Sequence, residues 1–405
     1  MDLPGPRPQP LGVLPWPAGL LVLPDVPEAV DIAAEILAGT VPQQWPESLR
    51  FYEAALTADP AVAADLIPGD DLIGDYNRAV LVGGEGVWED LAARSEGDLA
   101  ALVATARYSI GQIDDPPSAE GLEAEVAAMV RSARASAALE AHDVTAAEQE
   151  LRAAVEAASA VSPVLASTLR LTLAQVLADA GDYASAALIA DVAIQSLPLT
   201  ADRELRAHLQ MTRALARQQL AGDERGALLA VVGDLTEATK IFREETHPEL
   251  FAICNQQLAL AYLVMPMSDQ GDRLRLGVAV NALRAALRVY TPQTHPAQWA
   301  SAQVNLANAL QYLPSSHQEQ NLDEAVQLYE EVLQFRDPAS DPVGYARILS
   351  NQGNALGHLG VFDDARARLE QARVLFAEAG DNDSAATVGE ILAGLDDAAT
   401  AGAGS

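Results

Sequence analysis

Residues 294–313, THPAQWASAQVNLANALQYL, contain side chains that could perform chemistry. The stretch opens with a His-Pro pair and continues with Trp299 and several amides, a mixture that resembles parts of an active site. The same stretch places Leu306, Ala307 and Leu310 at spacings of three and four residues, which mark the apolar face of a helix. These residues therefore form either a reactive site or a contact between helices.

Familiar catalytic and metal-binding patterns are missing from the sequence. The chain has no GxSxG, HExxH, CxxC or Walker sequence, and its histidines show no HxxH spacing. A metal site needs two or more converging ligands. The single cysteine, Cys254, excludes an internal disulfide and indicates a reducing compartment, and its apolar helix favours a buried side chain over a reactive thiol. We therefore predict no catalytic activity, no cofactor and no metal.

The net charge of the chain excludes some classes of binding partner. With 57 acidic and 25 basic residues the net charge is −32, which argues against nucleic acid and against an anionic membrane surface. The apolar stretch at 11–24 is too short to span a bilayer, is broken by Pro15 and Pro17, and lacks a basic region before it. We expect a cytoplasmic protein in which residues 1–25 form an extended arm on the body.

A repeat explains why the opening residues recur. The segment from Thr246 matches the segment from Thr294 at an offset of 48 residues, and a third copy follows 46 residues later. One aromatic position recurs as Phe251, Trp299 and Tyr345, and recurrence at one position indicates one structural task, packing. His247 and His295, which precede proline in the first two copies, fit a turn or capping residue at a helix start. Each copy leads into a second helix with an apolar stripe.

These units resemble the tetratricopeptide (TPR) family, with its small, bulky, Gly, aromatic and Ala positions. The matching residues of the third copy are Gly353, Leu356, Gly360, Phe362, Ala365, Leu369 and Ala372, and an upstream unit matches at Ala174, Leu177, Gly181, Tyr183, Ala186, Ala190 and Ala193. The resemblance implies an all-α fold, an α-solenoid of stacked antiparallel helix pairs. Two copies are longer than the family's period, with inserted turns at 263–275 and 313–320, and this form resembles repeats of bacterial signalling and regulatory proteins.

The organisation expected from these patterns has six parts. In order, they are the extended arm 1–25, a helical N-terminal region 26–113 that is TPR-like in part, divergent TPR-like pairs 121–243, three clear TPR-like repeats 248–378, a capping helix 383–396 and a disordered tail 397–405. Residues 114–120 are expected to form a short hinge. The inserted turn with Met265 and Met267 is either a contact loop or a turn with methionines packed beneath it, and we favour packing.

The candidate binding face follows from the family resemblance, in which the first helix of each pair lines a concave groove. Amides there can grip a peptide backbone, because an amide offers both a donor and an acceptor. The candidate residues are Gln256, Gln257, Asn305, Asn308, Gln311, Tyr312, Arg347, Ser350, Asn351, Asn354 and His358. The alternative is that Asn305 and Asn351 bond to adjacent helices and stiffen the stack. The family's lysine clamp for a C-terminal carboxylate has no lysines here.

Three functions are compatible with the sequence. The leading hypothesis is a non-catalytic protein–protein interaction protein, a scaffold, adaptor or chaperone-like assembly helper that binds a segment of a partner protein. The second is a regulatory sensor for a small peptide or metabolite. The third is an enzyme in the N-terminal third that uses carboxylates such as Glu85, Glu89 and Asp90.

Overall fold

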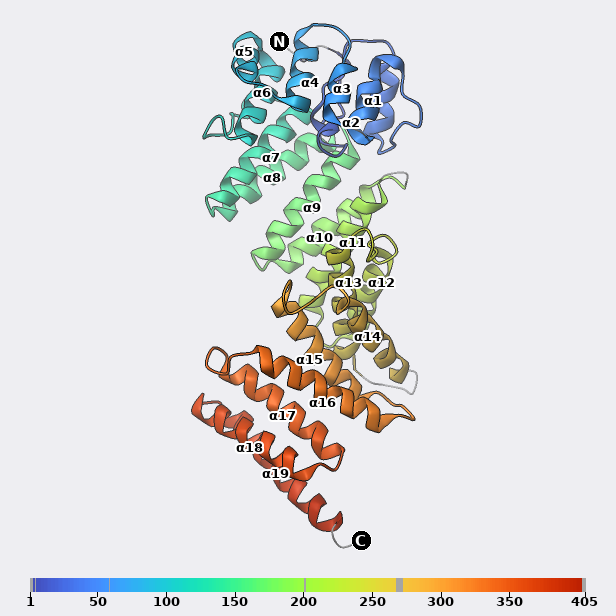
Figure 1. Ribbon diagram of the computed structural model, residues 1–405. Coiled ribbons are helices and arrows are strands. Elements are labelled where there is room, and N and C mark those ends of the chain that lie inside the picture. Colours follow the sequence, from blue (N-terminus) through green and yellow to red (C-terminus); the bar gives the residue numbers. More distant parts are fainter. Residues whose placement is uncertain (1–2, 4, 58, 200–201, 267–271, 403–405) are drawn as a thin grey trace. The chain divides into compact units, whose positions relative to one another are not determined.

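A computed structural model describes residues 3, 5–57, 59–199, 202–266 and 272–402. Within these ranges every regular element is a helix, and consecutive helices pack against one another in antiparallel pairs (Figure 1). This confirms the predicted α-solenoid of stacked helix pairs. The chain divides into two compact units, unit 1 at residues 1–220 and unit 2 at residues 221–405.

Unit 1 begins with short helices and continues with long pairs. Its elements are η1 (Ala18–Leu20), α1 (Ala29–Leu37), η2 (Glu47–Leu49), α2 (Arg50–Thr57), α3 (Pro60–Asp65), α4 (Leu72–Val82), α5 (Val87–Arg94), α6 (Gly97–Ser109), α7 (Ala124–Glu140), α8 (Val144–Ser159), α9 (Pro163–Asp179), α10 (Tyr183–Ser196) and α11 (Arg203–Ala221). The break between α4 and α5 lies at the glycine-rich stretch 83–86.

Unit 2 contains the three long repeats. Its helices are α12 (Arg225–Ala238), α13 (Pro248–Val264), α14 (Asp272–Ala286), α15 (Pro296–Tyr312), α16 (Gln318–Phe335), α17 (Pro342–His358), α18 (Phe362–Glu378) and α19 (Asn382–Gly402). Helices α13, α15 and α17 are the first members of successive pairs, and each also contacts the next one. The first helices of unit 2 therefore share one side of the stack.

The starts of the first helices follow from local sequence. Prolines 248, 296 and 342 occupy the first turn of α13, α15 and α17, where the missing N–H costs no hydrogen bond. Asp341 also caps α17 by accepting a hydrogen bond from the Gly344 N–H at 2.9 Å. His247 and His295 stand at the N-cap positions without a capping bond from the side chain. Each instead bonds through Nδ1 to the hydroxyl of the preceding threonine at 2.9 Å.

Alanine fills the contacts between paired helices in unit 2. Ala307 of α15 and Ala325 of α16 are fully buried in one continuous apolar cluster with Leu306 and Leu310. Small side chains let the helix axes approach, and larger side chains on adjacent turns fill the space. Trp299 is buried and packs edge-on against Phe335, with ring centroids 5.0 Å apart. The packing contact between helices that the repeat predicts for residues 294–313, called the seam below, is therefore present.

Glycine replaces alanine where α17 and α18 come closest. A Cβ on Gly353 would lie 2.7 Å from Leu369 Cγ and 3.1 Å from the Ala365 carbonyl oxygen. Real Cβ atoms essentially never approach so closely, so a larger residue would push the two helices apart. The family-like glycine at this position is thus explained by the helix crossing.

The inserted turns differ in part from the prediction. Helix α16 begins at Gln318, so the non-helical connection after α15 is 313–317 and the rest of the predicted turn 313–320 belongs to a longer second helix. Polar residues with good helix propensity, such as Gln318 and Glu319, explain this extension. In the other insertion Met265 is buried, as favoured, whereas Met267 lies outside the described residues.

Residues 3 and 5–24, called the arm below, differ from the extended arm on the body that we expected. They form turns and the short helix η1, and Leu11, Leu21 and Leu23 are completely buried. The reason is composition: the arm is apolar, and burying its side chains removes them from water. A Cβ on Gly12 would touch Leu165 of α9 and Met129 of α7. The arm therefore contributes to the interior of unit 1.

Buried polar side chains hold the backbone of the arm. Asn77 of α4 accepts a hydrogen bond from the Val22 N–H at 2.8 Å and donates one to the Val22 carbonyl at 2.7 Å. The Tyr52 hydroxyl donates to the Leu21 carbonyl at 2.7 Å, and Glu125 of α7 accepts from the Gln9 N–H at 3.0 Å. These bonds satisfy backbone groups that the irregular arm cannot pair with itself.

The C-terminal end also differs from the prediction. Helix α19 continues to Gly402, whereas we expected the capping helix to end at 396 and residues 397–405 to be disordered. The tail contains several alanines, which have the highest helix propensity, and no proline. Residues 403–405 lie outside the described residues. The predicted hinge at 114–120 is non-helical and precedes α7.

Candidate functional site: an amide face on unit 2

The predicted binding residues lie on α13, α15 and α17, the first helices of the pairs. Gln256 and Gln311 are buried, whereas Tyr312, Arg347 and His358 are exposed. The remaining candidates are partly buried, namely Gln257, Asn305, Asn308, Ser350, Asn351 and Asn354. Most of the candidate set is therefore positioned at the surface of the helices rather than inside the seam.

Four of these candidates form a hydrogen-bonded network across two helix pairs, together with Gln318 and the buried Tyr329. Tyr329 of α16 accepts a hydrogen bond from Gln311 Nε2 at 2.6 Å and donates one to Asn308 Oδ1 at 2.5 Å. From α17, Asn351 Nδ2 donates to Asn308 Oδ1 at 3.1 Å and Asn354 Nδ2 donates to Gln311 Oε1 at 3.4 Å. Gln318 Nε2 donates to the Gln311 carbonyl at 2.9 Å.

Tyr329 is the centre of this network. Its side chain is fully buried, and this burial raises the pKa of the phenol well above its ordinary range, with the Gln311 bond acting in the opposite direction. The hydroxyl therefore stays protonated and can donate to Asn308. Tyr329 stands among the buried apolar residues of α16, so its sequence spacing indicates packing and does not reveal the hydroxyl that reaches the first helices.

The network leaves one end of several amides available. Within the described residues, the hydrogen bonds use Asn308 Oδ1 but not its Nδ2, and they use the Nδ2 of Asn351 and Asn354 but not their Oδ1. Because one end of each amide is fixed, the rotamer and the direction of the other end are fixed too. We call the surface formed by Asn308, Asn351 and Asn354 the amide face. It presents a donor beside two acceptors.

Two other candidates bond locally. Asn305 Nδ2 reaches Ser301 Oγ of its own helix at 3.5 Å, and Gln256 Nε2 of α13 donates to the same oxygen at 3.3 Å. The stiffening alternative considered from the sequence therefore describes the Asn351 contact to α15, but Asn305 makes its bond within α15. Asn351 therefore combines both roles. Its Nδ2 bonds to the adjacent helix, and its Oδ1 is available to a partner.

The carboxylates considered as catalytic candidates, Glu85, Glu89 and Asp90, do not all line one site. Glu85 and Asp90 line an open cavity of about 450 Å³, together with Asp75 and two arginines, and Glu89 is not among its lining residues. Arg94 contacts Asp75 at 2.6 Å and Asp90 at 3.0 Å. Such exposed ion pairs are typical of a structural charge network. No cluster of three or more metal-ligating His, Cys, Asp or Glu side chains occurs in the described part of the chain.

Cys254 of α13 is a free, buried thiol. Burial raises its pKa from the ordinary 9.0 to about 12, so the reactive thiolate is disfavoured. Among the described residues, no helix is both apolar enough and long enough to cross a bilayer.

The chain is similar, at low identity, to a number of solved structures, three of which illustrate the range. They are the C-terminal part of a TPR repeat-containing protein from Cytophaga hutchinsonii (13% identity, TM-score 0.40, covering 71% of this chain and 93% of that one), a Rap protein complexed with Competence and Sporulation Factor (12%, 0.41, 87% and 97%) and the TPR2AB domain of yeast Sti1 in a pHSP90 complex (16%, 0.25, 66% and 98%). No protein-family profile and no curated protein matches the chain. At these similarities the function must be argued from the chain's own residues.

Proposed function

We propose that this protein is a non-catalytic interaction protein that binds a segment of a partner protein on the amide face of unit 2. The observation that supports this most directly is the set of oriented amide ends at Asn308, Asn351 and Asn354. A peptide backbone alternates N–H donors and C=O acceptors, which is the complement of a donor flanked by acceptors.

The surroundings of the amide face favour the same class of ligand. Tyr312 is 64% exposed at the end of α15, and an exposed aromatic ring is a common anchor for a partner side chain. Arg347 is the exposed cation on α17 among the candidate residues.

A peptide selection tests this proposal. Peptides displayed on phage are selected on the immobilised full chain, and the affinities of the selected sequences are measured by isothermal titration calorimetry. The double variant Asn351→Ala/Asn354→Ala removes two amides, and at ~1 kcal/mol for each hydrogen bond we expect affinity to fall about tenfold to a hundredfold.

The matched control carries the same number of amide changes on the second helices. Gln327 of α16 and Gln371 of α18 are exposed and make no described hydrogen bond through their side chains. The variant Gln327→Ala/Gln371→Ala should bind as the parent does, and both variants should keep their helical circular dichroism. Equal losses in the two double variants, or no peptide enriched above blank beads, would contradict the amide face as the binding site.

A further inference from the structure

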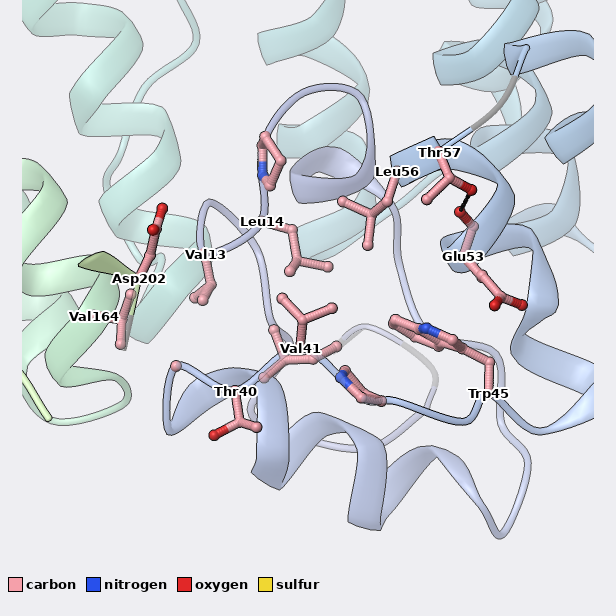
Figure 2. Close-up of a pocket in the computed structure, with 14 residues that line it drawn as sticks. Val13, Leu14, Thr40, Val41, Trp45, Glu53, Leu56, Thr57, Val164 and Asp202 are labelled. Atoms are coloured by element: carbon pink, nitrogen blue, oxygen red, sulfur yellow. Dashed lines mark hydrogen bonds between the residues drawn. The ribbon is translucent and has the colours of Figure 1, made fainter. Parts of the chain in front are cut away.

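A pocket in unit 1 lies apart from the amide face and concerns a different ligand. It is an open pocket bordered by the arm, the end of α1, the loop that follows it, and α2, with Val164 and Asp202 on one side (Figure 2). Its volume is about 520 Å³, within the range of sites that take small organic ligands. The apolar lining residues are Val13, Leu14, Pro15, Ile36, Val41, Pro42, Trp45, Leu56 and Val164.

The walls of this pocket are fixed by the surrounding core. Leu14, Ile36 and Val164 are buried, so their positions are set by packing, whereas Val41 is 52% exposed at the opening. The Trp45 ring stacks on Tyr52 with centroids 5.7 Å apart and planes within 3° of parallel. Because this stacking holds the indole, the pocket is formed before any ligand arrives.

The rim of the pocket is acidic. Glu53 and Asp202 are the charged residues of the lining, and no lysine, arginine or histidine is among them. Neither carboxylate has an ion-pair partner in the described part of the chain, and Asp202 uses Oδ1 to accept from the Glu204 N–H at 2.9 Å. In Figure 2 Asp202 lies beside Val164, and Glu53 lies beside Trp45, with Leu14 and Val41 between them.

These features select a ligand by its charge. An anion would meet two carboxylates without a compensating cation, in a chain of net charge −32. A cation would gain from either carboxylate and from the indole face of Trp45, which attracts positive charge. The apolar walls would take an apolar body. We propose that this pocket binds a small organic cation, an amine with an aliphatic or aromatic body, whose ammonium group pairs with Glu53 or Asp202.

Three probes with one apolar body test the charge preference. Octylamine, octanol and octanoate are titrated into the full chain by calorimetry at neutral pH and low ionic strength. We expect octylamine to bind at least threefold more tightly than octanol, with octanoate weakest, and the difference to shrink as salt is added. Equal affinity for the three probes, or tightest binding of octanoate, would overturn the proposal.

Variants separate this pocket from general attraction to an acidic surface. Val41→Trp places a large side chain at the opening and should abolish saturable octylamine binding. Glu53→Gln and Asp202→Asn should each weaken it about threefold, as expected for an exposed ion pair. Glu35→Gln, an exposed carboxylate of α1 outside the lining, is the matched control and should change nothing. Unchanged binding in Val41→Trp, or an equal loss in Glu35→Gln, would refute the assignment.

A second copy of the chain is the competing occupant of an apolar pocket. Sedimentation of the parent and of Val41→Trp distinguishes the two cases. The proposal requires the same oligomeric state in both proteins, with and without octylamine. A parent oligomer that dissociates in Val41→Trp or on addition of octylamine would assign the pocket to self-association instead.

Discussion

In unit 1 the first helices α7 and α9 carry apolar side chains, such as Met129 and Leu165, where the arm covers them, whereas in unit 2 the first helices α15 and α17 carry asparagines at their surface. Both units use paired helices joined through alanine. The difference lies in what covers the first helices. In unit 1 the chain's own arm covers them, whereas in unit 2 they carry amides that are available to a partner. One architecture therefore supports either an internal contact or an external one, according to a few side chains.

Of the changes considered, removal of residues 1–24 should produce the largest difference in stability between the two units. Four side chains of this segment, Leu11, Leu21, Val22 and Leu23, are fully buried. At ~1.5–3 kcal/mol each, their loss amounts to about 6–12 kcal/mol, which is comparable to the whole stability of a domain. Hydrogen exchange should show unit 1 unfolded and unit 2 still protected. Retained protection in α7 and α9 would mean that the arm is dispensable.

The same substitution in the two units should give different results. Asn77→Ala leaves the buried Val22 N–H and C=O without partners, and we expect a loss of about 2–4 kcal/mol in the free energy of unfolding of unit 1. Asn351→Ala removes one partly exposed bond, while Asn308 still accepts from Tyr329, so its cost in unit 2 should stay below ~1 kcal/mol. Denaturant titrations followed by hydrogen exchange measure both. Similar costs would remove the contrast.

The stabilisation that the Tyr329 hydroxyl gives should be largest at neutral pH and should decline at alkaline pH. Tyr329→Phe removes two hydrogen bonds and should destabilise unit 2 by about 1–2 kcal/mol at neutral pH. Because burial raises the folded pKa above the ordinary value of 10.0, this tyrosine stabilises the fold fully below that value and less as pH rises beyond it. The difference between parent and variant, measured by urea titration, should therefore narrow above pH 10. A constant difference would show that the phenol is not titrating as expected.

The labelling rate of Cys254 reports on the folding of unit 2 and should not change when the arm is removed. The rise of its pKa from 9.0 to about 12 strongly disfavours the thiolate, and the side chain is buried. A chromogenic disulfide reagent should therefore label it slowly in the native protein and quickly in denaturant. We expect the same slow rate after deletion of residues 1–24. Faster labelling in the deletion variant would show that the units are energetically coupled.

The repeat made most of the fold predictable from sequence. Spacings of three and four, first-turn prolines and recurring alanines are local signals, and they identified the helix pairs from 121 to 378 and the seam around Ala307. The amides were also visible, because they recur off the apolar stripe. Their fixed orientation was not, because it depends on Tyr329, which has the sequence position of an ordinary packing residue.

The features that sequence reasoning missed depend on contacts between distant segments. The arm has no helical period, and Asn77 and Glu125, which hold it, lie 55 and 116 residues from their partners. The pocket of unit 1 is lined by residues from Val13 to Asp202, so no single stretch reveals it. The Glu53 and Asp202 carboxylates have the sequence context of ordinary exposed acids.

The long separation between the arm and α9 has a consequence during synthesis. At roughly 5–20 residues per second, a ribosome that has made Leu11 needs about ten to thirty seconds to make Leu165, against which the arm packs. Throughout that interval an apolar, proline-rich nascent segment lacks the part of its native contact surface that α9 supplies. Overexpressed chains would be most prone to aggregate in this window, and slowed translation after residue 180 would not help, whereas a holdase acting on the first 25 residues would.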